Sequence, residues 1–181
     1  VVGVQPFGGH GLSGTGPKAG GEFYLQRLTK TDRYYSQFGD ENTLGNAQPV
    51  LDSITGERNS LAYLPSEVAI LNGDLAASEK AANKLLAKGF TILVEPSHPL
   101  AKSGKAGVRV DTKLDHCQKG IYLAELSKER RQWLAENSSA IFKCYDWQTT
   151  QDILPLYDEF SRSYNTTAAG GNTSLMSSEE H

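Results

Sequence analysis

The chain has 181 residues, of which 38% are hydrophobic and 22% charged, and its formal net charge is −3. These values are typical of a globular domain, and the slightly acidic balance offers no basic field for binding nucleic acid. The sequence contains no run of about 18 apolar residues that would predict a membrane span, nor a signal peptide or lipidation motif.

Residues 1–38 are predicted to form a loop, a helix and an exposed strand. An apolar start over Val1–Val4, without an initiator Met, suggests that the chain opens inside a folded domain, and a glycine-rich loop follows it. Pro17 suits the first turn of a helix, because its missing N–H costs nothing there, and Phe23–Leu28 would give that helix an apolar face. Thr29–Phe38 predicts an exposed strand. Such a strand needs a partner edge, so we expect a homo-oligomer to form through it.

Residues 39–64 are polar, contain Gly and Pro, and show little periodicity. We interpret them as a linker with at most one helical turn around Val50–Ile54.

Residues 65–154 alternate between apolar runs and helical patterns. Asp74 or Ser78 can cap the first predicted helix and Ser127 the second, and Trp133 and Leu134 would lie on the buried side of the latter. Ala106–Val110 is a weaker candidate for a further strand. Strands and helices at these spacings predict an α/β fold with a parallel sheet and crossover helices. The predicted strands are Val68–Leu71, Phe90–Val94, Ile121–Leu126 and Ala140–Tyr145, and the predicted helices are Leu75–Lys88 and the segment that follows Ser127.

Residues 155–181 combine a loosely alternating segment, Tyr157–Thr167, with a glycine-containing motif and a polar tail. The alternation predicts a terminal strand, and we expect the tail to fray.

Gly9, Gly11 and Gly14 satisfy the G-x-G-x-x-G pattern of dinucleotide-binding loops, and Asp32 lies roughly 20 residues further on. The context argues against that function, because Pro6 interrupts the expected strand and no second strand follows at the required distance. A glycine turn that lets the backbone approach a ligand or a neighbouring domain is the better interpretation.

The other chemically active residues give no site. Two cysteines, Cys117 and Cys144, cannot form a disulfide framework or a zinc site, and we expect both to be reduced thiols in a cytosolic protein. His116 and Cys117 are adjacent in sequence and would rarely face each other as a catalytic pair. We expect His98 and His116 to lie on the surface, and His10 to be a solvated loop residue.

Three motifs carry a resemblance to a known family. Gln5–Gly9, followed by the glycines up to Gly16, resembles the closing motif of the aldehyde dehydrogenase superfamily. The longer stretch 1–21 is similar to the glutamate-semialdehyde (1-pyrroline-5-carboxylate) dehydrogenase module of bacterial proline utilization A proteins. Asn165–Met176 resembles the C-terminal motif of the longer members of that family, and Thr55–Asn59 also matches. The motifs occur in the family's order.

The resemblance implies a four-part organisation. Residues 1–38 would be the C-terminal end of the aldehyde dehydrogenase catalytic domain and 39–64 a linker. Residues 65–154 would form a Rossmann-like domain of aldehyde-dehydrogenase-superfamily type, and 155–181 the terminal strand, motif and tail. The upstream aldehyde dehydrogenase domain would be the partner of this part of the polypeptide.

The resemblance also implies a function. The parent enzyme would oxidise proline to glutamate, with an FAD-dependent proline dehydrogenase and an NAD-dependent semialdehyde dehydrogenase joined by a tunnel. This part would cover the tunnel and assist assembly, with no catalytic residue, cofactor or metal of its own and no activity alone. The enzyme would be cytoplasmic, with peripheral association at the inner membrane.

Within that picture Phe7 would line the aldehyde pocket, where its ring can pack on the aliphatic chain of the substrate, and Gly8 and Gly9 would shape the loop. His10 replaces an arginine that is common at this position, and Phe160 replaces an expected basic residue. Two alternatives remain: a free-standing nucleotide-binding module, suggested by the alternating pattern, and a sheet-edge assembly element that uses Thr29–Phe38.

Overall fold

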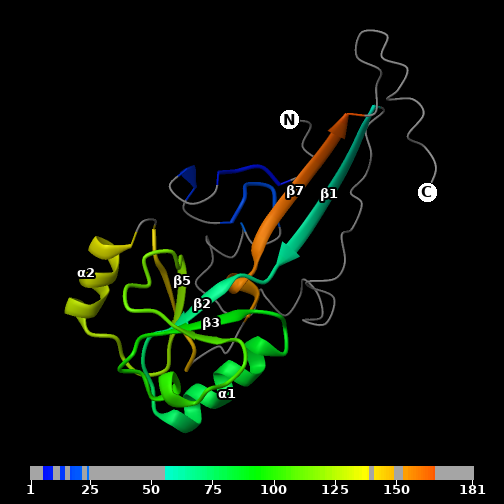
Figure 1. Ribbon diagram of the computed structural model, residues 1–181. Coiled ribbons are helices and arrows are strands. Elements are labelled where there is room, and N and C mark those ends of the chain that lie inside the picture. Colours follow the sequence, from blue (N-terminus) through cyan, green and yellow to red (C-terminus); the bar gives the residue numbers. More distant parts are fainter. Residues whose placement is uncertain are drawn as a thin grey trace.

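The computed structural model describes residues 6–9, 13–14, 17–21, 24, 56–138, 141–148 and 153–165. Within them the chain forms a five-stranded sheet and a separate two-stranded ribbon, which projects away from the sheet (Figure 1). No helix in this part of the chain is long and apolar enough to cross a membrane.

The five-stranded sheet is parallel throughout and has the order β4-β3-β2-β5-β6. The chain therefore winds outward in one direction from β2 and then in the other from β5, as in doubly wound sheets. The predicted parallel α/β sheet is confirmed, including the weaker candidate strand, which is β4. The strands are β2 (Glu67–Ile70), β3 (Thr91–Val94), β4 (Val108–Val110), β5 (Lys119–Tyr122) and β6 (Lys143–Asp146).

Two capped helices connect the strands. The carboxylate of Asp74 accepts a hydrogen bond from the backbone N–H of Ala77 at 2.7 Å and starts α1 (Leu75–Leu86), which links β2 to β3. The hydroxyl of Ser127 accepts from the N–H of Arg130 at 3.1 Å and starts α2 (Lys128–Asn137), which links β5 to β6. Each cap satisfies an N–H that the helix itself cannot pair. Of the two predicted caps for α1, Asp74 is the one used.

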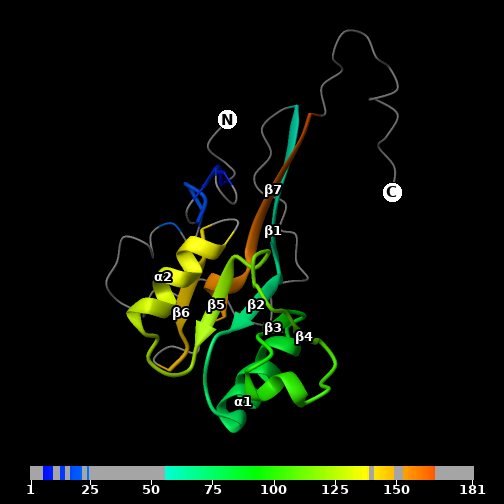
Figure 2. The ribbon, with the colours of Figure 1, turned by 60° about the vertical axis from the view of Figure 1, so that its left-hand side comes forward.

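The helices cover opposite faces of the sheet (Figure 2). Because alternate strand residues point to opposite faces, Val68 and Ile70 join the cluster that contains Leu85 of α1, whereas Ala69 joins the cluster that contains Leu134 of α2. A strand buried on both faces reads as a continuous apolar run, which explains why these strands were visible in the sequence.

The ribbon pairs β1 (Glu57–Leu64) with β7 (Asp158–Asn165) in antiparallel register, and a short helix, η5 (Leu154–Leu156), precedes β7. The predicted terminal strand is therefore present. Residues 57–64 form a strand where the sequence predicted the end of a linker. Its buried face begins with the polar Asn59, which is fully buried, and its partner is distant in sequence, so neither alternation nor a turn signalled it.

The segment around Pro17 does not begin a helix, contrary to prediction. Phe7 and Ala19 form an isolated antiparallel bridge, and Gly20 has a φ of +78°, outside the helical region. The described part of this segment therefore folds back on itself. The predicted strand at Val1–Val4, the remainder of the predicted helix apart from Tyr24, the pairing strand Thr29–Phe38, the turn around Val50–Ile54 and the chain beyond Asn165 lie outside the described residues.

His98 is buried, which corrects the prediction that it lies on the surface, whereas His116 is exposed as predicted. The Nδ1 atom of His98 accepts a hydrogen bond from the N–H of Leu100 at 3.2 Å and caps the short helix η4 (Pro99–Lys102). Burial lowers the pKa of His98 from its ordinary value. A hydrogen bond with the backbone of Asn72 and the negative charge of Glu95 raise the pKa, but burial is the largest effect.

The lowered pKa predicts a loss of stability in mild acid. The unfolded chain takes up a proton at His98 near pH 6.5 and the folded chain only at lower pH, so the free energy of unfolding falls as the pH falls below about 6.5. Urea titrations between pH 8 and 5 measure this. In His98→Asn, which keeps a capping side chain, the fall should be smaller; an unchanged pH dependence would contradict the assignment.

Candidate substrate loop and its anchor

Phe7 lies in a backbone hairpin that presents its side chain outward. The N–H of Phe7 donates to the carbonyl of Ala19 and the N–H of Ala19 to the carbonyl of Phe7, both at 2.9 Å. The ammonium of Lys18 donates to the carbonyl of Gly8 at 2.7 Å and ties the two sides again. Phe7 is 63% exposed. The described loop therefore leaves its aromatic ring accessible for contact with another molecule or domain.

The glycines of this loop differ in what they permit. A Cβ atom on Gly9 would lie 2.0 Å from the carbonyl oxygen of Ser13, and one on Gly14 would lie 2.4 Å from the carbonyl oxygen of Gly9. Backbone thus touches backbone at these positions, and only glycine fits. A Cβ on Gly8 would meet Lys18 at 3.4 Å, an ordinary contact. Close backbone approach, rather than a phosphate site, is what Gly9 and Gly14 provide here.

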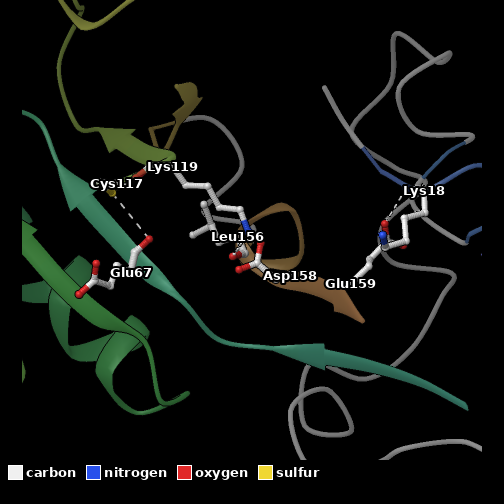
Figure 3. Close-up of polar contacts among 7 residues, drawn as sticks. All are labelled: Lys18, Glu67, Cys117, Lys119, Leu156, Asp158 and Glu159. Carbon is white, nitrogen blue, oxygen red and sulfur yellow. Dashed lines mark hydrogen bonds and ion pairs between the residues drawn. The ribbon is translucent and has the colours of Figure 1, made fainter. Parts of the chain in front are cut away.

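The carboxylate of Glu159 anchors the loop to the ribbon. It accepts a hydrogen bond at 2.7 Å from the backbone N–H of Lys18, which is 141 residues away in sequence (Figure 3). A Cβ on Gly21 would lie 2.8 Å from the other carboxylate oxygen, so the loop backbone sits directly against this side chain. Hydrogen bonds with one charged partner are stronger than neutral ones. Sequence reasoning missed this role of Glu159, for which no local signal exists.

The neighbouring residue, Asp158, ties the same strand to the sheet. The buried ammonium of Lys119, at the start of β5, donates to the carboxylate of Asp158 at 2.6 Å and to the carbonyl of Leu156 at 2.8 Å. Burial lowers the pKa of Lys119, and the charge of Asp158 opposes that shift. Because successive strand residues point in opposite directions, the adjacent acids Asp158 and Glu159 connect β7 to two different partners.

A polar cavity of about 200 Å³ lies beside this pair, with Glu67, Cys117, Lys119 and Asp158 among its lining residues. Burial raises the pKa of the Cys117 thiol to about 11, so it remains protonated at neutral pH, and a protonated thiol is a poor nucleophile. Burial also raises the pKa of Cys144. In the part of the chain that the structure describes, no group of three or more His, Cys, Asp or Glu residues could hold a metal ion.

The opposite edge of the sheet is where doubly wound proteins hold ligands, in the crevice at the carboxyl ends of the strands where the winding reverses. Here that crevice lies between β2 and β5 and is occupied by Asn72. Its side-chain carbonyl accepts from the N–H groups of Leu123 and Ala124 at 2.8 and 3.1 Å, and its amide donates to the carbonyl of Ala124 at 2.8 Å. Sequence reasoning missed this role of Asn72.

Charge at the same edge also disfavours a phosphate. The N-terminus of α1, where a phosphate would bind in a nucleotide site, holds the carboxylate of Asp74. An ion pair between Glu95, just after β3, and Arg130 of α2 spans the edge. A Cβ on Gly73 would lie 2.8 Å from the side chain of Leu123, and this glycine has a φ of +129°. The turn after β2 is therefore packed against protein rather than open to a ligand.

The contrast between Gly8 and Gly9 makes a matched pair of variants. We expect Gly9→Ala to break the hairpin, because its Cβ would overlap the backbone of Ser13, whereas Gly8→Ala should preserve it. Amide hydrogen exchange at Phe7 and Ala19 reports on the two bridge bonds. Exchange at least tenfold faster in Gly9→Ala than in Gly8→Ala is the expected result, and equal rates would refute the described geometry.

Two ion pairs of equal length, 2.6 Å, make a second comparison among the described residues. Lys119–Asp158 is buried, whereas Arg109–Glu67 has side chains that are 67% and 38% exposed. Asp158→Asn leaves an uncompensated buried charge and should lower the free energy of unfolding by about 3 kcal/mol; Glu67→Gln should cost at most about 1 kcal/mol. Urea unfolding of both variants measures the difference, and equal losses would contradict it.

Comparison with known proteins places this geometry in context. No family model matches the chain. It is 30% identical over 242 residues to the bifunctional protein PutA of Rhizobium meliloti and 31% identical over 243 residues to that of Salmonella typhimurium. Each match covers 97% of this chain and 18% of the relative. Because these alignments are longer than the chain's 181 residues, the relatives carry dozens of residues in this stretch that the chain lacks.

A solved structure agrees in fold. The proline utilization A protein (PutA) from Corynebacterium freiburgense matches with a TM-score of 0.55 at 16% identity, over 93% of this chain and 19% of that one. The chain thus spans about a fifth of the length of the relatives it matches. Its homologues are bifunctional PutA proteins, and the described hairpin, ribbon and parallel sheet are the chain's counterpart of a limited stretch of them.

Proposed function

We propose that this chain is the C-terminal part of a PutA-type bifunctional enzyme that oxidises proline to glutamate. The observation that carries the proposal is the loop around Phe7, which presents an exposed ring on a hairpin anchored by Glu159 and whose sequence resembles the closing motif of aldehyde dehydrogenases. The homology to PutA proteins over 97% of the chain supports it.

In this proposal residues 1–38 complete the aldehyde dehydrogenase domain, and 65–154 form a Rossmann-like domain of the same superfamily type that performs no catalysis. The linker 39–64 and the terminal part 155–181 meet in the ribbon of β1 and β7. This part covers the tunnel between the two active sites and assists assembly, and Thr29–Phe38 joins a homo-oligomer.

The chemistry resides upstream. FAD would serve the proline dehydrogenase and NAD⁺ the semialdehyde dehydrogenase, both held by domains of the parent polypeptide. The described cysteines suit this division, because Cys117 is a buried thiol with a raised pKa. Phe7 packs on the aliphatic chain of the semialdehyde, and Gly8 and Gly9 shape the loop. The parent enzyme is cytoplasmic in this proposal and associates peripherally with the inner membrane.

The geometry disfavours the alternative of a nucleotide-binding module. Its ligand would need the crevice that Asn72 fills and the helix N-terminus that Asp74 caps. Calorimetry of the chain with NAD⁺, NADP⁺ and ATP tests this alternative: we expect no heat of binding, and submicromolar affinity for any of them would favour it instead.

The activity test uses Phe7. In the full-length parent enzyme, Phe7→Ala removes apolar contact with the substrate chain, which is worth about 1.5 to 3 kcal/mol for a fully buried ring. We expect kcat/KM for glutamate semialdehyde to fall by about tenfold or more, with a smaller fall in Phe7→Leu and no change in proline oxidation. Unchanged semialdehyde kinetics in Phe7→Ala would overturn the assignment of this loop to the aldehyde pocket.

A further inference from the structure

We infer that Glu159 is a positioning residue for semialdehyde oxidation: its carboxylate, on the terminal ribbon, holds the Phe7 loop in the conformation that receives the substrate. The inference rests on the proposed function, since it takes Phe7 as a residue of the aldehyde pocket. It adds a residue on β7 that sequence resemblance did not assign to the site.

The contacts form a short path from Glu159 to Phe7. The carboxylate accepts from the N–H of Lys18 at 2.7 Å. The next residue, Ala19, exchanges two backbone hydrogen bonds with Phe7, and the side chain of Lys18 donates to the carbonyl of Gly8. Lys18 is therefore held by Glu159 through its backbone and holds the loop through its ammonium. Movement of the Lys18 backbone would displace both ties to the residues around Phe7.

The loop backbone packs closely against the carboxylate of Glu159 in addition to donating a hydrogen bond to it. A Cβ on Gly21 would stand 2.8 Å from Glu159, 3.0 Å from the carbonyl of Lys18 and 3.3 Å from the side chain of Pro6. Gly21 itself is buried. The carboxylate thus packs against the backbone of Gly21 as well as accepting a hydrogen bond from Lys18.

Glu159 is supported from behind. Its backbone pairs with Tyr63 of β1, and the adjacent Asp158 is fixed by the buried ammonium of Lys119 (Figure 3). A functional loop is held most accurately when the residues that support it are themselves fixed. The anchor of the Phe7 loop is therefore tied to the sheet through one neighbouring residue.

The expected kinetic effect falls on substrate binding. Glu159 contacts the loop and not the reacting atoms, so its loss lowers the fraction of molecules whose loop is competent to bind. The apparent dissociation constant rises by the inverse of that fraction. We expect KM for glutamate semialdehyde to rise about tenfold in Glu159→Ala, with kcat within twofold of wild type.

The experiment compares steady-state kinetics in the full-length parent enzyme. Glu159→Gln keeps an oxygen that can accept from Lys18 and should show an intermediate KM. Glu79→Ala removes an exposed carboxylate on α1 and should behave as wild type. Gly21→Ala disturbs the same contact from the loop side and should reproduce the rise in KM, which keeps the test decisive if Glu159→Ala does not fold.

A double-mutant cycle separates positioning from a general structural role. If Glu159 acts through the loop, Glu159→Ala should add little to the KM of Phe7→Ala, because the ring it positions is absent; independent effects would multiply. Amide exchange at Phe7 and Ala19 should quicken in Glu159→Ala and not in Glu79→Ala.

The outcomes distinguish the two claims. If Phe7→Ala leaves semialdehyde kinetics unchanged, the proposed function of the loop fails and the inference fails with it. If Phe7→Ala raises KM but Glu159→Ala does not, or if the two effects multiply, the proposed function stands and Glu159 is not a positioning residue.

Discussion

The arrangement of this protein depends on the burial of one charge, the ammonium of Lys119. Only 5% of this residue is exposed, and an unpaired buried charge is strongly destabilising. Its partners, the carboxylate of Asp158 and the carbonyl of Leu156, both come from the segment that returns to the sheet after β6. The position of β7 is therefore fixed where it starts, at the amino edge of the sheet.

Fixing Asp158 also fixes the next residue of the strand, Glu159. A two-stranded ribbon has little stability alone, and β1 and β7 project from the sheet as such a ribbon. The strand alternates its side chains, so Glu159 faces away from Lys119 and toward the hairpin of Phe7. The contact of Asp158 with the sheet and the contact of Glu159 with the loop are thereby coupled through one peptide bond, which explains how residues at the two ends of the described chain come into contact.

The sequence predicted the parts whose signals are local. The strands β2 and β3 were visible as apolar runs, and α1 and α2 through the capping residues Asp74 and Ser127. It did not predict the roles of Glu159 and Asn72, because their contacts are distant in sequence. Glu159 binds the backbone of Lys18, and Asn72 binds a turn more than 50 residues away. The prediction that His98 lies on the surface was wrong because its ring is buried and caps a short helix, a contact that nothing in the sequence pattern indicated.

The two edges of the sheet differ in what their polar side chains contact. At the carboxyl edge the side chain of Asn72 forms hydrogen bonds with the backbone groups of Leu123 and Ala124. These bonds tie the turn after β5 to the residue that follows β2. At the amino edge the buried Lys119 instead binds Asp158 of the ribbon, and the adjacent Glu159 binds the loop. The sheet thus stabilises a neighbouring element through the edge that such folds rarely use for binding.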